Sequence, residues 1–288
     1  MIVRPHAKVN LQLRITGRRE DGYHTLDTVF LPVSLYDVLE AEEAEAFSFS
    51  CSDPALEGPG NLVLRAYARM KERFDLPPVR IRLTKQIPSQ AGLGGGSADA
   101  AGMLLLLNEM FSLGCSREDL AQIAVPLGAD VPAMLCDQPM HGLGTGEILT
   151  PVPCRTVLPL LIVKPPVGFS TPAMFRAWDK THAGREPGGG EQEMQALIRA
   201  LSAGDLPGIA AGLRNDLEKA LSAEEAALIG SIKEELLRAG ALGACMSGSG
   251  SAVFGLFDNV APRDAAAEML RNTYREDFIS ACEGLCDE

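Results

Sequence analysis

Short runs in which apolar and polar residues alternate recur along the chain, and this period of two is typical of half-buried β-strands. The clearest examples are residues 7–15, "AKVNLQLRI", and residues 79–87, "VRIRLTKQI". Residues 29–40 and 45–51 are similar in character and are predicted to form further strands. The first part of the chain is therefore expected to contain a sheet.

Apolar residues at helical spacing separate these runs. One helix is predicted after Asn61, whose side chain suits an N-cap, and another over about 98–111. The segment "SREDLAQIAVPLG" at 116–128 starts with Ser116 and has Asp119 three residues later, which is the pattern of a capping box.

The alternation of strand-like and helix-like segments starts again after about residue 152. Strands are predicted at 156–165 and within 244–257, and helices at 171–181, 193–203, 205–220, 223–239 and 262–275. The Gly-rich polar stretch 182–192 is predicted to be a mobile surface loop. This order of elements predicts an α+β protein with two domains, 1–152 and 153–288.

Composition places the chain among ordinary globular proteins. Its 288 residues are 46% hydrophobic and 22% charged, which is enough to bury a substantial core. The net charge of −12 argues against a general nucleic-acid binder, although a local cluster of donors can still bind a small anion. The N-terminus lacks the apolar core of a signal peptide, and no apolar run is long enough to span a bilayer. A cytoplasmic protein is expected.

Cysteine and histidine positions do not indicate a metal site or a disulfide framework. The seven cysteines are odd in number, scattered and without a C-x-x-C pair, so reduced thiols are expected. The four histidines lack the spacing of a zinc site.

The most specific local pattern is "PSQAGLGGGSADAAG" at residues 88–102, which joins a predicted strand to a predicted helix. Glycines permit positive φ and a close approach of the backbone to a ligand. The N-terminus of the following helix adds free N–H groups and a partial positive charge, so this segment is suited to phosphate. A loop that serves only packing is the alternative.

Several known phosphate loops and catalytic motifs do not fit this segment. No Gly-Lys pair exists for a Walker A motif, and the Rossmann spacing from Gly92 and Gly94 ends on Ser97 instead of glycine. The protein kinase motifs and the G-x-S-x-G elbow are also missing from the sequence. A loop that binds phosphate through backbone amides remains.

The segment resembles the central motif of the GHMP kinases, P-x-x-x-G-L-G-S-S-A. The matching positions are Pro88, Gly92, Leu93 and Gly94. Gly95 and Gly96 replace the two serines of that pattern, and Ser97 follows them. Further similarity to the family, in the same order along the chain, is found at 7–30, 127–135, 144–152 and 246–257. The triple glycine is similar to the branch of the family that phosphorylates a cytidine diphosphate alcohol on the non-mevalonate route to isoprenoids.

The resemblance implies a two-domain α+β fold with an N-terminal domain similar to ribosomal protein S5 and a C-terminal α/β-plait domain. The active site would lie in the cleft between these domains. The reaction would be phosphoryl transfer from ATP, with Mg²⁺, to a small-molecule substrate carrying a cytidine diphosphate group. No nucleic acid or membrane partner is implied, and the chain would be a monomer or a weak homodimer. The Mg²⁺ ligands stay unassigned, because glycine occupies the family's usual serine position.

Asp130 and Lys8 are the residues on which the resemblance places the chemistry. Asp130, in "LGADVPAML", would take the proton of the substrate hydroxyl, and Lys8 would lower the pKa of Asp130 and orient the alcohol. From the residues alone, Asp130 is equally explained as a helix cap or a satisfied buried carboxylate, and Lys8 as a charge on the solvent face of a strand.

The substrate-binding residues implied by the resemblance are Asn10, Tyr23, His24, Phe30, Thr171 and Phe175. Tyr23 and Phe175 would cover the two faces of cytosine, and His24 would bond to its edge. Phe30 is equally explained as an ordinary core residue.

The implied ATP-binding residues are Asn61, Lys85, Pro88, Ser89, Gln90, Ala91, Gly92, Leu93, Gly94, Gly95, Gly96, Ser97 and Ala98. Asn61 and Lys85 would lie near adenine, although a helix cap and a strand-end charge explain them as well. The Gly/Ser loop at 246–250 would form part of the floor of the site, or alternatively a tight turn that permits close packing.

Other functions are compatible with parts of the sequence. A GHMP kinase of the homoserine or mevalonate type would leave the aromatic residues without a base to bind. A nucleotide-binding module without catalysis would not need Asp130 and Lys8. RNA binding is suggested by the S5-like arrangement, but the acidic net charge opposes it.

Overall fold

The computed structural model describes residues 1–182 and 190–286, and these residues form two compact units. As far as they are described, the first unit comprises Met1–Ala7, Leu35–Ser89 and Gly94–Asp137, and the second comprises Lys8–Ser34, Gln90–Leu93 and Gln138–Glu288. The domain boundaries at residues 152 and 153 stay a prediction about the sequence. Most of the predicted loop at 182–192 lies outside the described residues.

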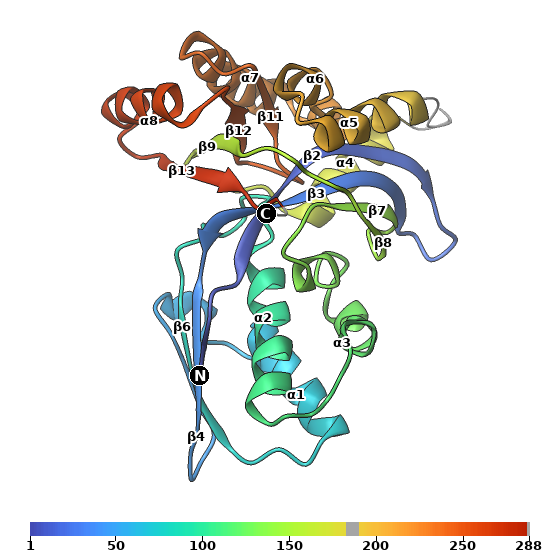
Figure 1. Cartoon of the computed structure of the whole chain (residues 1–288), viewed down its shortest axis with the longest axis vertical. Coiled ribbons are helices and arrows are strands. Elements are labelled where there is room, and N and C mark those ends of the chain that lie inside the picture. Colours follow the sequence, from blue (N-terminus) through green and yellow to red (C-terminus); the bar gives the residue numbers. More distant parts are fainter. Residues whose placement is uncertain (183–189, 287–288) are drawn as a thin grey trace. The chain divides into compact units, whose positions relative to one another are not determined.

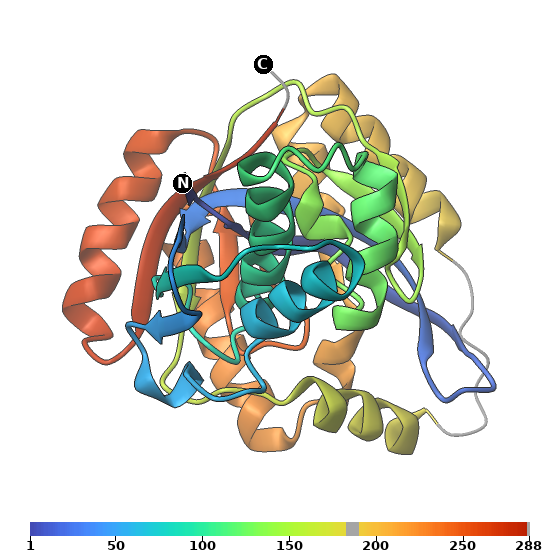
Figure 2. The same ribbon diagram turned by 90° about the horizontal axis from the view of Figure 1, so that it is seen from below.

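The first unit is built on a four-stranded sheet in the order β1-β4-β6-β5. The strands are β1 (Ile2–Val3), β4 (Val38–Glu43), β5 (Ser48–Cys51) and β6 (Val79–Thr84). Strand β4 is antiparallel to both of its neighbours, whereas β5 is parallel to β6. Its helices are α1 (Leu62–Arg73), α2 (Gly95–Met110) and α3 (Arg117–Ala124). Helices α1 and α2 lie side by side in both views (Figure 1, Figure 2).

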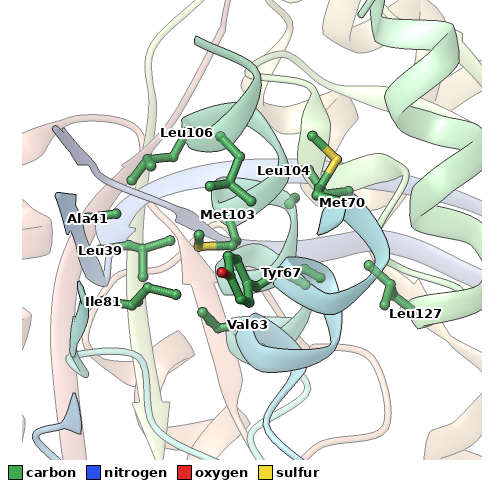
Figure 3. Packing of buried hydrophobic residues seen from close by; sticks show 14 of the residues in the cluster. Leu39, Ala41, Val63, Tyr67, Met70, Ile81, Met103, Leu104, Leu106 and Leu127 are labelled. Atoms are coloured by element: carbon green, nitrogen blue, oxygen red, sulfur yellow. The ribbon is translucent and has the colours of Figure 1, made fainter. Parts of the chain in front are cut away.

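The core of the first unit lies between this sheet and the two long helices (Figure 3). Strand alternation places Leu39, Ala41 and Ile81 on the buried side, as the period of two predicts. Helix α2 is apolar around most of its surface, and residues such as Met103 and Leu106 are completely buried. The helix that follows the glycine-rich loop is thus an anchored core element.

Local capping signals in this unit act as the sequence predicts. The Asn61 side chain accepts a hydrogen bond from the Val63 amide, and Ser116 and Asp119 form a reciprocal capping box at the start of α3. The start of α2 differs from the prediction, because the helix begins at Gly95 and its N-cap is Gly94. Of the three consecutive glycines, Gly94 therefore caps the helix, and Gly95 and Gly96 belong to its first turn.

The second unit contains a sheet in the order β10-β2-β3-β13-β9-β12-β11, and a hairpin of β7 and β8 is attached through β3. The strands are β2 (His6–Arg18), β3 (His24–Tyr36), β7 (Met140–Gly144), β8 (Ile148–Pro151), β9 (Leu158–Lys164), β10 (Arg214–Asn215), β11 (Gly243–Met246), β12 (Val253–Leu256) and β13 (Phe278–Gly284). Strands β2 and β3 each also include residues of the first unit.

Five α-helices are described in the second unit. They are α4 (Thr171–Thr181), α5 (Glu191–Ala203), α6 (Leu206–Ala211), α7 (Ala223–Arg238) and α8 (Val260–Thr273). Helix α7 packs against β11 and β12, and α8 packs against β9 and β13 (Figure 1). Trp178 of α4 and Phe257 after β12 belong to the shared core of this unit.

One prediction about secondary structure in this unit is wrong, and one strand is missing from the prediction. Residues 205–220 do not form one helix: α6 ends at Ala211, strand β10 follows, and a 3-10 helix covers Asp216–Ala220. Strand β13 was not predicted at all, although it lies between β3 and β9. Its pairing partners are more than a hundred residues earlier in the chain, so no local pattern reveals that the segment is central.

The expectation that every cysteine is reduced is also wrong. Cys154 and Cys286 form a disulfide across 132 residues of chain, with their Cα atoms 5.1 Å apart. The other five cysteines are free thiols. Folding brings together two cysteines whose spacing carries no recognisable pattern. Within the described helices, none is long and apolar enough to cross a membrane.

Candidate active site

The glycine-rich loop takes a conformation that requires glycine at two positions. Gly92 and Gly94 have φ values of +73° and +71°. A Cβ atom on Gly92 would lie 2.0 Å from the Ser247 carbonyl oxygen, so no side chain fits there. Even Gln90 has a positive φ of 51°, and its carbonyl oxygen accepts hydrogen bonds from the Phe169 and Ser251 amides. The loop is therefore fixed by backbone contacts within the second unit.

The start of α2 has the features of an anion site. Gly94 caps the helix without a side-chain hydrogen bond, and the first turn contains no acidic residue. The first amides of such a helix are not used by its own hydrogen bonds and carry the positive end of the helix dipole. They can therefore donate to phosphate oxygens.

The ammonium group of Lys8 lies on the glycine-rich loop. Lys8 Nζ donates to Asn10 Oδ1 at 2.6 Å and to the Gly92 carbonyl oxygen at 2.9 Å. The Lys8 amide also donates to the Leu93 carbonyl oxygen at 3.0 Å. Only 3% of Lys8 is exposed, so the explanation as a solvent-facing strand charge does not hold.

The side chain of Asn10 connects Lys8 to the sheet. Its Oδ1 accepts from Lys8, and its Nδ2 donates to Thr28 Oγ1 at 2.9 Å. The Thr28 hydroxyl in turn donates to the Gln12 carbonyl oxygen at 2.7 Å. In this buried series of hydrogen bonds, Lys8 donates to Asn10, Asn10 to Thr28, and Thr28 to the Gln12 carbonyl oxygen. This order determines the orientation of the Asn10 amide.

The second Gly/Ser loop, 246–250, packs on the first. Ser247 Oγ donates to the Gly92 carbonyl oxygen at 3.0 Å. Gly248 has a φ of +52°, and a Cβ there would lie 3.1 Å from Lys8 Nζ. Asn215 Nδ2 donates to the carbonyl oxygens of Met246 at 2.8 Å and Gly248 at 2.7 Å. No local pattern marks Asn215, because it lies within residues 205–220, for which a helix is predicted.

Two substrate residues predicted from the resemblance lie together in the second unit. The rings of His24 and Phe175 are stacked, with centroids 4.9 Å apart and planes 20° apart. His24 Nε2 lies 2.6 Å from Asp179 Oδ1, and this carboxylate was not predicted. Tyr23, in contrast, is 64% exposed. The pair in the structure is thus His24 with Phe175.

The remaining residues predicted in the second unit are placed as follows. Thr171 Oγ1 lies 2.8 Å from Ser249 Oγ, at the start of α4. Phe30 is 3% exposed, as a core residue would be, and Lys8 Nζ lies 5.8 Å from the centroid of its ring. Phe30 therefore combines packing with a cation–π contact to the catalytic candidate.

Asp130 belongs to the first unit and is half-buried in a turn. Its carbonyl oxygen accepts from the Met134 amide at 3.2 Å. The short 3-10 helix that follows, Ala133–Leu135, has Pro132 as its N-cap. The explanation of Asp130 as the cap of that helix is therefore not what the structure shows.

Asn61 and Lys85, predicted near adenine, have structural partners in the first unit. Asn61 Nδ2 donates to the Leu56 carbonyl oxygen at 2.8 Å, and its Oδ1 caps α1. Lys85 Nζ contacts carboxylate oxygens of both Asp37 and Asp99, neither of which was predicted. Contact of Asn61 or Lys85 with adenine stays a prediction.

The pKa values of Lys85 and Asp99 are both raised. Burial acts to lower the pKa of Lys85, but the two carboxylates outweigh it, so the pKa is raised. Burial raises the pKa of Asp99 to about 7, and Lys85 only partly opposes this effect. Asp99 therefore exchanges a proton near neutral pH.

The described residues contain no group of three or more His, Cys, Asp or Glu side chains that could hold a metal ion. Mg²⁺ in nucleotide sites is usually held by one or two carboxylates together with phosphate oxygens and water. Such a site does not require a cluster of three protein ligands.

Family models match both halves of the chain. The model described as GHMP kinases N terminal domain matches residues 61–138, and the model described as GHMP kinases C terminal matches residues 197–276. Together the two models match more than half of the chain. They confirm the predicted two-domain fold.

Similar proteins agree with these matches. The chain is 37% identical to 4-diphosphocytidyl-2-C-methyl-D-erythritol kinase of Thermoanaerobacter pseudethanolicus (strain ATCC 33223 / 39E), over 96% of this chain and 94% of the relative. It is 42% identical to the protein of the same name from Moorella thermoacetica (strain ATCC 39073 / JCM 9320), over 96% of both chains.

Solved structures give the same result. A crystal structure of 4-(cytidine 5'-diphospho)-2C-methyl-D-erythritol kinase is similar with a TM-score of 0.80 and 34% identity, over 99% of each chain. Homoserine kinase from Cytophaga hutchinsonii ATCC 33406 shares the fold, with a TM-score of 0.74 and 18% identity, over 98% of this chain and 93% of that one. On the family models and the relatives together, the chain belongs to the GHMP kinases.

Proposed function

We propose that this chain is a 4-diphosphocytidyl-2-C-methyl-D-erythritol kinase. It transfers the γ-phosphoryl group of ATP to the 2-hydroxyl of that alcohol, on the non-mevalonate route to isoprenoid precursors. Relatives of that name are similar along nearly the whole chain, which supports this substrate over homoserine or mevalonate. The observation that carries the catalytic part is the buried Lys8 ammonium, bonded directly to the carbonyl oxygen of Gly92.

The glycine-rich loop and the first turn of α2 bind the phosphates of ATP. Their backbone amides replace the lysine of a Walker A loop, and Lys8 supplies positive charge from β2. Mg²⁺, when bound, lowers the negative charge of the β- and γ-phosphate oxygens. These parts act by position and charge, which is what phosphoryl transfer requires of a protein.

Asp130 takes the proton of the 2-hydroxyl. The hydroxyl oxygen forms a bond to the γ-phosphorus while the bond from that phosphorus to the β-γ bridging oxygen breaks, and ADP leaves. A half-buried carboxylate is suited to this task because it orients the alcohol and holds the proton that the alcohol loses. Lys8 stabilises the negative charge that develops on the transferred group.

The cytosine ring is bound by His24, Phe175 and Tyr23. The carboxylate of Asp179 fixes the proton of a neutral His24 on Nε2, which leaves Nδ1 as an acceptor for the amino group of cytosine. Phe175 provides a flat apolar face, and the exposed Tyr23 can cover the other face. The remaining substrate-binding residues are Asn10, Phe30 and Thr171. The chain acts in the cytoplasm, as a monomer or a weak homodimer.

The acceptor alcohol is tested by measuring ADP release with a panel of substrates. We expect turnover with 4-diphosphocytidyl-2-C-methyl-D-erythritol to exceed turnover with homoserine or mevalonate by orders of magnitude. Faster turnover of an acceptor without cytidine would reject the proposal. Binding of ATP without ADP release on any acceptor would favour a nucleotide-binding module.

The role of Asp130 is tested with Asp130→Asn. Because the amide cannot take the proton, kcat should fall by at least about 1000-fold while ATP binding stays close to wild type. Asp137→Asn, a change of an exposed carboxylate in the same unit, is the control and should keep full activity. Near-normal turnover by the Asp130 variant would remove Asp130 from the reaction.

A further inference from the structure

Three charged side chains of the first unit form a buried cluster beside the glycine-rich loop. Lys85 lies just after β6, Asp37 lies between β3 and β4, and Asp99 lies in α2. Lys85 Nζ contacts Asp37 Oδ2, and it lies 2.6 Å from Asp99 Oδ2. The side chains of Asp37, Asp99 and Lys85 are 0%, 4% and 10% exposed. Solvent therefore screens this cluster little.

Asp37 binds the backbone just before the glycine-rich loop. Its Oδ1 accepts from the amides of Gln86 at 2.5 Å and Ile87 at 2.8 Å. Its own amide donates to the Pro5 carbonyl oxygen at 3.0 Å. One oxygen of this carboxylate thus binds the backbone before the loop, while the other binds Lys85.

Asp99 is part of α2, the helix that follows the glycine-rich loop, and it attaches this helix to the cluster. Through Lys85 it is tied to the same Asp37, so both ends of the loop are attached to one cluster. The packing at this point is tight: a Cβ on Gly95 would lie 2.9 Å from Ile87 Cγ2 and 3.4 Å from Lys85 Nζ. The distance between the end of β6 and the first turn of α2 therefore depends on these contacts.

The cluster is not a balanced ion pair. Two carboxylates surround one ammonium group, and Asp99 Oδ1 is buried without a hydrogen-bond partner among the described residues. An unsatisfied buried polar atom has a stability cost. Burial raises the pKa of Asp99 toward neutrality, which reduces the surplus negative charge beside a loop that binds anions. Because apolar replacement of a buried ion cluster is often neutral or stabilising, stability alone is a weak explanation for this one.

We infer that Asp99 is a positioning residue that acts through Lys85 and Asp37 to set the phosphate-binding amides of Gly94–Ser97. The two carboxylates hold the Lys85 ammonium group inside this cluster, so a positioning role accounts for Lys85 without an adenine contact. The inference rests on the proposed binding of ATP by the loop. It differs from the adenine contact that the family resemblance implies for Lys85.

The two roles differ in which part of ATP they affect. A positioning cluster acts on the phosphates, so Asp99→Ala should weaken binding of both ATP and inorganic tripolyphosphate, each by at least about 10-fold. Adenosine, if it binds measurably, should bind the variant as it binds the wild type. Calorimetric titration of the full chain with each ligand in the presence of Mg²⁺ measures all three.

Control variants separate this effect from general destabilisation. Asp99→Asn keeps the shape and one acceptor for Lys85, and it should restore most of the binding. Arg263→Met removes another buried charge, in α8, whose contacts are with Cys282, Asp264 and Glu283. It should lower the melting temperature without changing the affinity for tripolyphosphate. If Asp99→Ala does not fold, Asp99→Ser provides the same comparison.

Each result has a distinct meaning. A variant that loses affinity for ATP but not for tripolyphosphate would overturn the inference in favour of the adenine contact. Unchanged affinity for both ligands would overturn it as well. A wild-type chain that binds neither ligand would refute the proposed function itself, and this outcome is recognisable before any variant is made.

Discussion

At the residue scale, the Asn10 side chain determines where the Lys8 ammonium group lies. Its amide is bonded at both ends, to Lys8 and to Thr28, so Lys8 cannot turn away without breaking a buried hydrogen bond. The resemblance implies that Asn10 binds a polar part of the substrate. The geometry adds a second role, because the same amide orients the Lys8 ammonium.

Asn10→Ala should lower kcat by about 10- to 100-fold with little change in KM for ATP, because Lys8 loses its fixed orientation. Thr28→Val removes the hydroxyl behind Asn10 and should produce a smaller decrease of the same kind. Steady-state kinetics with both substrates measures these effects. A change confined to KM for the alcohol would instead identify Asn10 as only a substrate contact.

Asp99 makes stability depend on pH. Its pKa is raised by burial from 3.8 to about 7 in the folded chain, with Lys85 and Asp37 as its charged neighbours. In the unfolded chain the carboxyl group ionises near its ordinary value. Between these two pKa values the folded chain binds the extra proton. The stabilisation due to Asp99 is therefore fully present below the unfolded pKa and is lost as the pH rises through about 7.

Chemical denaturation of the wild type and Asp99→Asn between about pH 5 and 8 tests this effect. The wild type should lose free energy of unfolding relative to the variant as the pH rises, because asparagine does not titrate. Stability curves that run parallel across the range would show that Asp99 does not titrate there.

At the scale of elements, the glycine-rich loop couples local conformation to packing. Gly92 combines a positive φ with a backbone contact that no side chain tolerates, whereas Gly114 has a similar φ of +69° and open space around it. Comparing the two positions separates the cost of backbone strain from the cost of the contact.

Gly114→Ala should cost about 1–2 kcal/mol through left-handed strain alone. Gly92→Ala should cost more and should abolish activity, because the loop must move away from Ser247. Thermal unfolding and ADP release measure both effects. Equal costs at the two positions would show that the contact between Gly92 and the 246–250 loop does not matter.

At the scale of the whole molecule, one disulfide bond links two segments that are far apart in the chain. The disulfide between Cys154 and Cys286 attaches the residues after β13 to the segment before β9. Such a link restricts the unfolded chain, and the effect increases slowly with loop length.

Reduction, or the double change of Cys154 and Cys286 to serine, should lower the free energy of unfolding by about 2–4 kcal/mol. The serine variant should then be insensitive to reductant. Thiol titration in denaturant should find five free thiols before reduction, which are Cys51, Cys115, Cys136, Cys245 and Cys282. Seven thiols before reduction would show that the bond does not form in solution.

Local chemistry in the sequence determined much of this protein. The period of two marks β2 and β6, Asn61 and the Ser116–Asp119 box mark two helix starts, and glycine marks the loop with positive φ values before α2. These features depend on neighbouring residues only, so the sequence displays them directly. The order of the motifs along the chain was sufficient to predict the GHMP kinase family and its fold.

Only the tertiary structure decided which distant groups meet. The partners of Lys85, the support of the 246–250 loop by Asn215 and the central place of β13 all join segments far apart in the chain. The disulfide across 132 residues is the extreme case. Hydrogen bonds and ion pairs form between groups that folding brings within a few ångströms, and no residue pattern records that distance. The sequence therefore determined that the loop has the glycines that a phosphate site requires, and the fold determined which residues hold the loop in place.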